Sequence, residues 1–372
     1  MHNEPGSDYK CIRIPSIVVA GRLLVALAAG RRWYGDGCCP ASAFPTRGVC
    51  VNSSSGSAAG LGADGELTAA AAAADSGCRT DLVMKTSSDS GRSWSPLSVA
   101  VPCAGSCNAL TTRSGELLLY HSNTTDNLLS RAKPANGKIV FGAAEVVRNG
   151  SATFRTPAGG PMRLSPGPGR AIQLSSTHPI APGRILSEGY YPLPGCSSRM
   201  VCNQSAVQVY YSDDGGLTHT ASRTQLPGVD ESQLLELEDG SLRLYSRNRL
   251  SCFGRGKTTN ARGMCMAVTS STDAGATWFG TRANPALARS DCATSVLRHP
   301  SAPGGVLVTL PEYNGLDCTY STMGRWNGTV RFSGDSGASW PAAAGVRVTD
   351  FPPSPFAHDQ GSFKTAHFGC KA

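Results

Sequence analysis

Four aspartates occupy the same place in a recurring motif, Ser-x-Asp-x-Gly-x-Ser/Thr-Trp, and are the most regularly spaced carboxylates of the chain. Such a carboxylate can act as an acid–base catalyst or as a hydrogen-bond acceptor that caps a turn. The turn is favoured here, because Gly supplies a positive φ and Asp can accept backbone N–H groups inside a tight turn. The four copies span residues 87–94, 212–219, 271–278 and 333–340, with His219 in the Trp place of the second copy.

Motifs for several other chemistries are absent from the sequence. The seven histidines form no His-Glu-x-x-His motif, and the chain has neither a Gly-x-Ser-x-Gly elbow nor a phosphate-binding loop. A zinc protease, a serine hydrolase and a nucleotide-binding enzyme therefore lack a starting point. We expect no cofactor and no metal.

The motifs also define the elements that carry them. A β-like run precedes each copy, at residues 81–85, 206–210, 264–268 and 328–332. The copies start at 87, 212, 271 and 333, so the later gaps are 59 and 62 residues, and the first gap of 125 fits two repeats with one degenerate copy. A period of this length in a chain of short strands predicts an all-β, six-bladed β-propeller over residues 1–372, whose last blade need not be complete.

Two features near the start refine this prediction. The apolar run from Ile14 to Ala29 is interpreted as two strands around a turn at Gly21, because Arg22 interrupts it. Residues 33–74 break the repeat and are rich in Ser, Gly and Ala. We interpret them as a low-complexity insertion in the first blade.

Composition excludes other classes of protein. The 43 Gly and 24 Pro make 67 of 372 residues, which argues against a helical bundle. No apolar run is long enough for a membrane span, which needs about 18 residues. The net charge of +8 comes from scattered basic residues, without zinc-finger or helix-turn-helix signals, so we expect no nucleic acid. A small anionic substrate is compatible with this charge.

Cysteines and glycosylation signals bear on the compartment. The 14 cysteines contain no Cys-x-x-Cys spacing, which favours disulfides over a metal site. The cysteine count and the glycosylation signals predict a secreted or lumenal, lysosome-like protein. The N-terminus lacks a visible signal peptide, so an incomplete start, another export route and the cell interior stay open. Five Asn-x-Ser/Thr sequons support the secretory pathway, at Asn52, Asn123, Asn149, Asn203 and Asn327.

The repeated motif resembles the Asp-box of the sialidases (neuraminidases), which also occurs in non-catalytic propellers and sorting receptors. Arg13-Ile14-Pro15, ahead of the first copy, resembles the Arg-Ile-Pro motif of that family. Glu231 and Arg247 resemble a Glu that opens one family strand and an Arg that ends the next. Arg325 resembles the family arginine before the strand that leads into the last Asp-box.

The resemblance implies roles for these residues. Arg13, Arg247 and Arg325 would converge on a substrate carboxylate, to which guanidinium groups offer fork-shaped donors. The general acid would be Asp75, with Asp81 and Asp36 as rivals. A loop carboxyl shielded from water has a raised pKa and can protonate a leaving oxygen.

The nucleophile of sialidases is a tyrosine rather than a carboxylate. A carboxylate would be repelled by the substrate carboxylate next to the reacting carbon, whereas a phenol activated by Glu231 avoids this. Here the chain departs from the family pattern, because Phe356 occupies the Tyr place and no Tyr follows Tyr320.

These residues predict an exo-α-sialidase, a retaining glycoside hydrolase that releases terminal sialic acid. Its partners would be sialylated glycans on glycoproteins, gangliosides and oligosaccharides. Two alternatives stay open. Phe356 motivates a sialidase-like lectin that binds the sugar without cleaving it, and the Asp-boxes alone are equally compatible with a scaffold that binds proteins.

Overall fold

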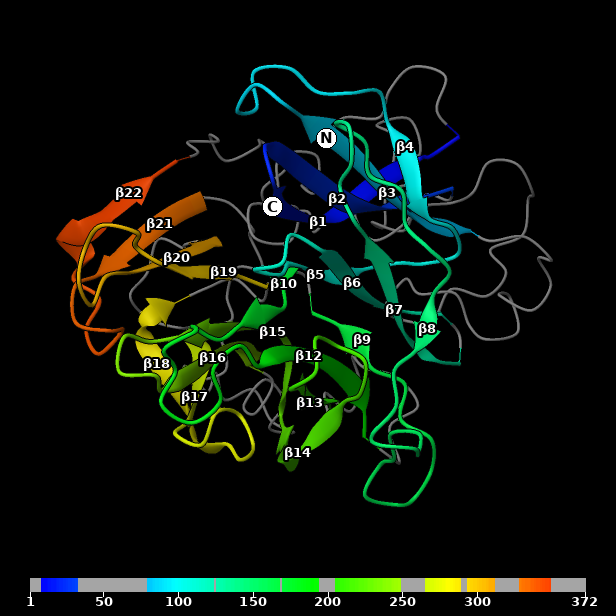
Figure 1. Ribbon diagram of the computed structural model, residues 1–372. Helices are drawn as coiled ribbons and strands as arrows, with labels where there is room; N and C mark the ends of the chain where they lie inside the picture. Colours follow the sequence, from blue (N-terminus) through cyan, green and yellow to red (C-terminus); the bar gives the residue numbers. More distant parts are fainter. Residues whose placement is uncertain are drawn as a thin grey trace, which may run out of the picture.

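The computed structural model describes residues 8–32, 79–123, 125–167, 169–193, 205–248, 265–288, 293–311 and 328–348. These residues form a β-propeller whose sheets stand around a common centre (Figure 1). Its strands fall into five sheets that follow one another along the chain.

Each sheet is one blade, numbered here from the N-terminus. Blade 1 comprises β1 (Cys11–Ala20), β2 (Leu23–Arg31), β3 (Thr80–Ser87) and β4 (Ser98–Val101). Blade 2 comprises β5 (Cys107–Thr111), β6 (Leu117–Ser122), β7 (Asn127–Ala132), β8 (Glu145–Val146) and β10 (Gly169–Arg170). Blade 3 comprises β9 (Ser165–Pro166), β11 (Ile172–Gln173), β12 (Ile185–Pro192), β13 (Ser205–Ser212) and β14 (Thr220–Pro227).

The last two blades follow the same antiparallel order. Blade 4 comprises β15 (Val229–Glu236), β16 (Leu242–Asn248), β17 (Cys265–Ser271) and β18 (Phe279–Ala288). Blade 5 comprises β19 (Ser295–Arg298), β20 (Val306–Pro311), β21 (Gly328–Ser333) and β22 (Gly345–Arg347), and a 3-10 turn at Ala342–Ala344 precedes β22.

The prediction of six blades is wrong for the described residues, which form five. The repeat spacing gives the length of one blade, and dividing the chain length by this spacing assumes that every residue of the chain belongs to a blade. The 125-residue gap was interpreted correctly, because blade 2 is the degenerate repeat and lacks the motif after β7. The predicted insertion at 33–74 lies outside the described residues.

The hydrophobic core lies between adjacent blades. In β6, Leu117 and Leu119 belong to the cluster shared with blade 1, whereas Leu118 and Tyr120 belong to the cluster shared with blade 3. This is the period of two expected for a strand, but both faces are buried. That explains why β6 is an unbroken apolar run rather than an alternating one.

The motif aspartates cap the turns after the third strands, as the sequence predicts. In the fourth copy Ser333 Oγ donates to Asp335 Oδ1 at 2.6 Å, and Ser339 N donates to the same oxygen at 2.8 Å. Ser336 and Gly337 have φ of 58° and 80°, the left-handed conformation in which Gly is least strained. We call the four copies the Asp turns.

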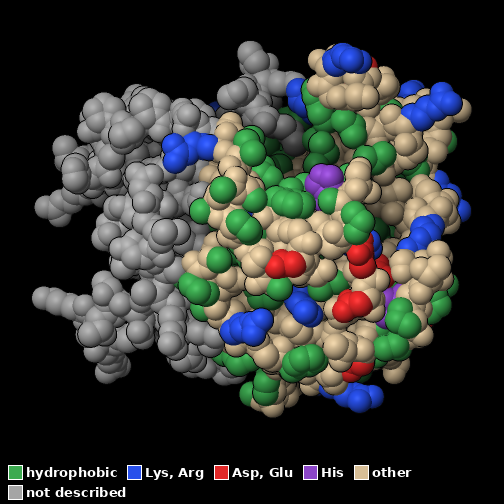
Figure 2. All heavy atoms as spheres, turned by 90° about the vertical axis from the view of Figure 1, so that its left-hand side faces the viewer, with side chains coloured by type: hydrophobic (Ala, Val, Ile, Leu, Met, Phe, Trp, Pro, Cys, Tyr) green, Lys and Arg blue, Asp and Glu red, His purple; other side chains and the backbone are tan. Residues whose placement is uncertain are grey.

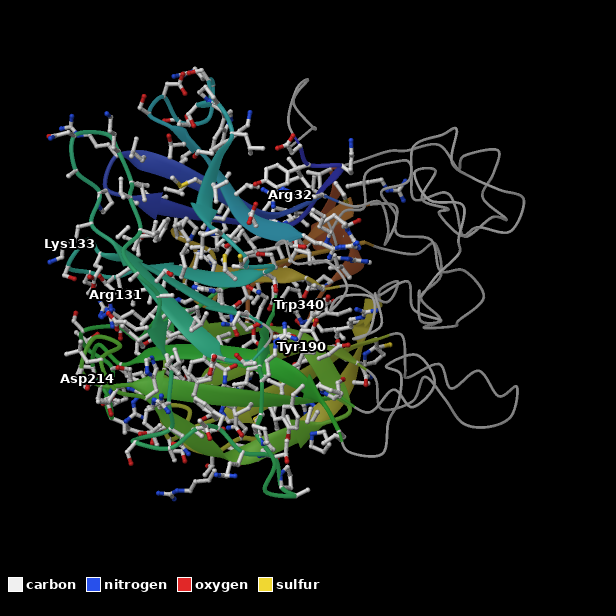
Figure 3. All side chains as sticks on the ribbon, turned by 90° about the vertical axis from the view of Figure 1, so that its right-hand side faces the viewer. Arg32, Arg131, Lys133, Tyr190, Asp214 and Trp340 are labelled. Atoms are coloured by element: carbon white, nitrogen blue, oxygen red, sulfur yellow. The ribbon has the colours of Figure 1, made fainter. Side chains whose placement is uncertain are left out.

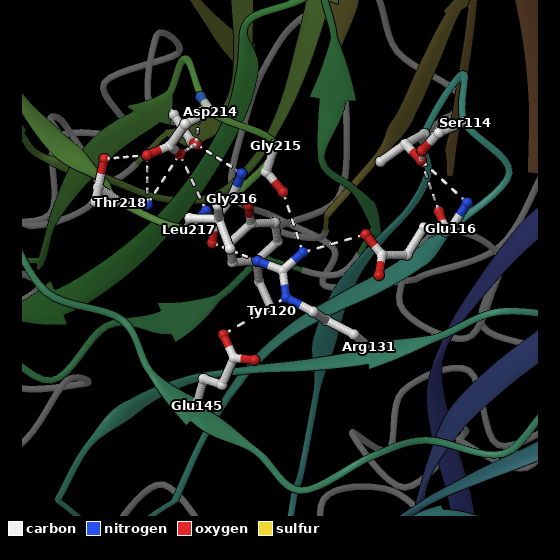
Figure 4. A network of polar contacts seen from close by, with 12 residues as sticks. Ser114, Glu116, Tyr120, Arg131, Glu145, Asp214, Gly215, Gly216, Leu217 and Thr218 are labelled. Carbon is white, nitrogen blue, oxygen red and sulfur yellow. Dashed lines mark hydrogen bonds and ion pairs between the residues drawn. The ribbon is translucent and has the colours of Figure 1, made fainter.

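The Asp turns also join neighbouring blades. Figure 4 shows Arg131 of blade 2 reaching the Asp turn of blade 3, where its guanidinium donates to the carbonyls of Gly215 at 3.0 Å and Gly216 at 2.5 Å. The same group pairs with Glu116 at 3.2 Å and Glu145 at 3.5 Å. His219 packs edge-on against Tyr120 and Tyr210, so it fills the Trp place with another aromatic ring.

The centre of the propeller holds the short strands between β8 and β12. Strand β10 pairs in parallel with β5, with Gly169 opposite Asn108. Ser16 Oγ of β1 donates to the Gly169 carbonyl at 2.6 Å. These contacts join the innermost strand of blade 1 to the inner edge of blade 2.

Two further observations concern the sequence predictions. In the described residues no helix has the length and hydrophobicity needed to cross a membrane. Cys107 is a buried free thiol, and the pairing of the remaining cysteines stays a prediction.

Candidate functional site

The Asp turns and the predicted site residue Arg13 lie at opposite ends of the blades. The Asp turns follow the third strand of a blade, and Ser87 at the end of β3 pairs with Leu24 at the start of β2. Arg13 lies near the start of β1 and pairs with Ala29 near the end of β2, so it belongs to the opposite end. Figure 3 shows Asp214 and Arg131 on one side of the ribbon. Arg32, which follows β2, and Tyr190, near the end of β12, lie toward the other side. We call this second end the site end.

The site end brings together two of the predicted residues, Glu231 and Arg247. Arg247 Nη1 donates to Glu231 Oε2 at 2.9 Å, and Arg247 Nε lies 3.9 Å from Asp230 Oδ1. The three side chains are 12%, 17% and 8% exposed, in the order Arg247, Glu231, Asp230. Burying a charge pair costs free energy unless its geometry is good. Because these three charged side chains are nonetheless mostly buried together, we take the cluster as a candidate binding centre.

A β-bulge explains why two carboxylates face one arginine. Val229 pairs with Asn248 and Ser232 with Ser246, so Asp230 and Glu231 together stand opposite Arg247. An extra residue in one strand re-aims its side chains. The sequence singled out Glu231 but not Asp230, although the two are adjacent.

Arg13 lies next to an equivalent irregularity in β1. Arg13 pairs with Ala29 and Ser16 with Leu27, so Ile14 and Pro15 share one partner position. Ile14 has a φ of 56°, a strained value for a β-branched residue, and such strain is often stored at functional sites. Pro15 cannot donate to a sheet and suits a bulge. Arg13 itself is buried, at 4% exposure.

Asp81, a rival for the general acid, has an unsuitable environment. It is buried at 2% exposure and receives hydrogen bonds from Tyr9 Oη at 2.7 Å and Cys103 N at 2.9 Å. Arg32 Nη2 lies 2.7 Å from its carboxylate. Burial raises the pKa of Asp81, but these donors outweigh it and the pKa is lowered. Asp81 is therefore an ionised structural anchor, not a proton donor.

The remaining predicted site residues are not placed. Asp75, Asp36, Arg325 and Phe356 lie outside the described residues. Their roles stay predictions, as does the convergence of the three arginines. Within the described residues no group of three His, Cys, Asp or Glu side chains is arranged to hold a metal ion.

The sequence did not predict Glu188, a carboxyl at the centre of the propeller. Glu188 of β12 is 1% exposed, and Asn108 Nδ2 donates to its Oε1 at 3.2 Å and to its carbonyl at 2.8 Å. Burial, with smaller contributions from the charges of Glu231 and Asp230, raises the pKa of Glu188 to about 8. Glu188 thus belongs electrostatically to the site end.

Figure 2 shows how charged side chains are distributed on one face of the molecule. On the side shown in Figure 2, Lys and Arg side chains lie among acidic, polar and apolar ones and form no continuous basic surface.

No protein-family model matches the chain. A Bacteroides fragilis protein named sialidase is 27% identical over 181 residues, which are 48% of this chain and 28% of that protein. The Hadza microbial sialidase Hz136 has a TM-score of 0.57 at 18% identity, covering 89% of this chain and 57% of that one.

A Trypanosoma rangeli sialidase in complex with the inhibitor DANA has a TM-score of 0.55 at 18% identity, covering 87% of this chain and 47% of that one. The predicted resemblance to the sialidase superfamily is confirmed. This sialidase-like propeller spans about half the length of the two solved sialidases and less of the Bacteroides protein.

Proposed function

We propose that the protein is an exo-α-sialidase, a retaining glycosidase that acts on terminal sialic acid of glycoproteins, gangliosides and oligosaccharides. The observation that supports this most is the pairing of Glu231 with Arg247 at 2.9 Å at the site end. The two residues were selected from sequence as base and clamp, and they are neighbours in a sialidase-like fold.

The chemistry we propose follows from these groups. Arg247, with Arg13 and Arg325, binds the carboxylate of the sugar through charge-assisted hydrogen bonds. Glu231 withdraws the proton of a hydroxyl nucleophile that attacks the anomeric carbon, and Asp75 protonates the departing glycosidic oxygen. Asp75, now deprotonated, takes a proton from water, which attacks the anomeric carbon and displaces the enzyme oxygen, so that two inversions give net retention. The secreted or lumenal location is part of this proposal, because sialylated glycans occur there.

Turnover of a fluorogenic sialoside tests the proposal. We expect the wild type to release the fluorophore and the E231Q variant to be slower by about 100-fold or more, because a neutral amide cannot act as a base. The matched control is E238Q, since Glu238 is 44% exposed and pairs only at the surface with Arg298 at 3.3 Å. Equal rates for E231Q and the wild type would contradict the role of Glu231.

The second candidate is a lectin that binds sialic acid without cleaving it. Phe356, which has no hydroxyl, favours it. Binding of free sialic acid without turnover of the fluorogenic sialoside would establish it. If sialic acid neither binds nor raises the melting temperature, both sugar-binding functions are refuted and the protein scaffold remains.

A further inference from the structure

Glu188 has contacts that an ordinary core residue does not need. Its Oε1 accepts from Asn108 of β5 and from the backbone N–H of Gly167, so one carboxyl oxygen joins blade 2 to the segment between β9 and β10. A Cβ on Gly167 would lie 2.9 Å from the Ser232 carbonyl oxygen and closer still to Glu188 Oε1. Gly167 is therefore held between Glu188 and the residue that follows Asp230 and Glu231 in β15.

The second carboxyl oxygen of Glu188, Oε2, differs from Oε1 in its hydrogen bonding. Oε2 is buried and has no hydrogen-bond partner within the described residues. An ionised oxygen there would be a buried charge without a donor, which costs far more than a neutral one. The geometry thus favours the protonated acid, in which Oε1 accepts and Oε2 carries the proton.

The charges around Glu188 point the same way. Asp230 and Glu231 of β15 both act on it and disfavour its ionisation. On the other side Tyr210 of β13 is fully buried, and burial raises its pKa far above the usual range, so it stays neutral. Asn108 donates but carries no charge. With Glu188 neutral, the Asp230, Glu231 and Arg247 side chains sum to one negative charge when ionised, and an ionised Glu188 would make two.

We propose that Glu188, as a neutral acid, is the positioning residue beneath the Asp230–Glu231–Arg247 cluster, and that loss of its proton at high pH ends the binding of acidic sugars there. It acts by holding Gly167 against Ser232 and by withholding a charge. An ionised Glu188 would add a negative charge beside Asp230 and Glu231 and repel the ligand carboxylate. This inference rests on the proposed function for its ligand, but the neutral carboxyl can be tested without any ligand.

The first experiment measures folding stability against pH for wild type, E188Q and the control E238Q. Gln keeps the shape, an acceptor at Oε1 and a neutral group. Because the pKa of Glu188 rises from 4.5 to about 8 on folding, the folded state holds an extra proton between these values. Its stabilisation is complete below pH 4.5 and is lost as pH rises toward 8.

Relative to E188Q, the folded-to-unfolded ratio of the wild type should fall about tenfold per pH unit between pH 5.5 and 7.5, or about 1.4 kcal/mol per unit. E238Q should follow the wild type. Parallel curves for wild type and E188Q would overturn the neutral carboxyl. Should E188Q not fold, the infrared carbonyl band of a protonated carboxyl in the wild type at pH 6.5 gives the same answer, and its absence would overturn the proposal.

The second experiment measures DANA affinity by calorimetry from pH 5.5 to 9.5. Wild type and E238Q should bind equally to about pH 7.5 and then weaken by up to tenfold per pH unit, whereas E188Q should stay flat. If Glu188 had only a structural role, E188Q would bind DANA more weakly at every pH, with the same pH dependence as the wild type. That result would overturn the proposed loss of binding on deprotonation of Glu188. If no variant bound DANA at any pH, both the proposed function and the pH-dependent binding would be refuted. The stability curves would still decide whether Glu188 is protonated.

Discussion

The carboxylates at the two ends of the propeller lie in opposite environments. In the Asp turns, Ser93 donates to Asp89 through its hydroxyl at 2.5 Å and its N–H at 2.9 Å. These bonds, with one from Ser87, lower the pKa of Asp89 to about 2. At the site end, burial raises the pKa of Glu188 to about 8.

The contrast separates carboxylates that shape the fold from those that could serve a function. The Asp turns repeat in four blades with the same partners, so their acidity is a property of the turn. Asp230, Glu231 and Glu188 do not repeat from blade to blade. Asp230 and Glu231 lie at the bulge of β15, whereas Glu188 lies in β12, where the pairing with β13 is regular. A proton-exchanging group needs a pKa near the working pH, which the first set lacks.

Removing the Arg247 guanidinium from the site end should have the largest effect. We expect R247A to weaken the binding of free sialic acid by about 100-fold, because truncation of one member of a buried charge pair leaves the other uncompensated. R298A, which removes an exposed arginine from a surface ion pair, is the control and should bind as the wild type. Calorimetry at pH 6 checks both. Equal losses in the two variants would remove the distinction between the ends.

Filling the space at Gly167 should have the next largest effect. G167A places a methyl group 2.9 Å from the Ser232 carbonyl and against Glu188, and overpacking of this kind costs about 1–3 kcal/mol. G105A is the matched control, because no atom lies within 4 Å of a Cβ there. Urea unfolding measures both. A neutral G167A would show that the centre is loosely packed.

Breaking an Asp turn should cost less and should not affect the sugar. D214A loses acceptors for Thr218 N at 2.9 Å and Leu217 N at 3.0 Å, and we expect about 2 kcal/mol of lost stability. D213A next to it removes only an ion pair of a 58% exposed carboxylate with Arg184, worth at most about 1 kcal/mol. Both should keep wild-type sialic acid affinity. A loss of affinity in D214A alone would show that the two ends are coupled.

The smallest expected effect is on folding stability at low pH. Because the pKa of Asp89 is about 2 in the folded state, below its ordinary value of 3.8, its contribution to stability is present above pH 4 and is lost as pH falls toward 2. D89N should therefore flatten the acid limb of the stability curve slightly. The alkaline trend caused by Glu188 should not change. A stability curve of D89N that differs from that of the wild type mainly above pH 5 would contradict the assignment of this acid-dependent stability to Asp89.

Local patterns predicted much of the fold. The β-like run before each motif is the third strand of a blade, because strand, turn and cap lie within about 15 residues of sequence. The blade count was wrong for the described residues, because the repeat spacing gives the length of one blade but not how many residues of the chain belong to blades; the described residues form five sheets. The turn at Gly21 was predicted correctly, and its φ is 63°.

The sequence predicted only those contacts of the site that join residues close together in the chain. Glu231 and Arg247 are 16 residues apart on neighbouring strands, so their pairing follows from one hairpin. Glu188 was missed because Asn108, which is 80 residues away, and Gly167 create its environment. Asp230 was missed because a bulge, not alternation, turns it toward Arg247.

The most direct measurement of the central claim is a crystal structure of the wild type with DANA at pH 6. The account predicts the ligand at the site end, with its carboxylate within hydrogen-bond distance, about 3 Å, of the Arg247 guanidinium. DANA bound elsewhere, or an unoccupied site end at saturating ligand concentration, would contradict it.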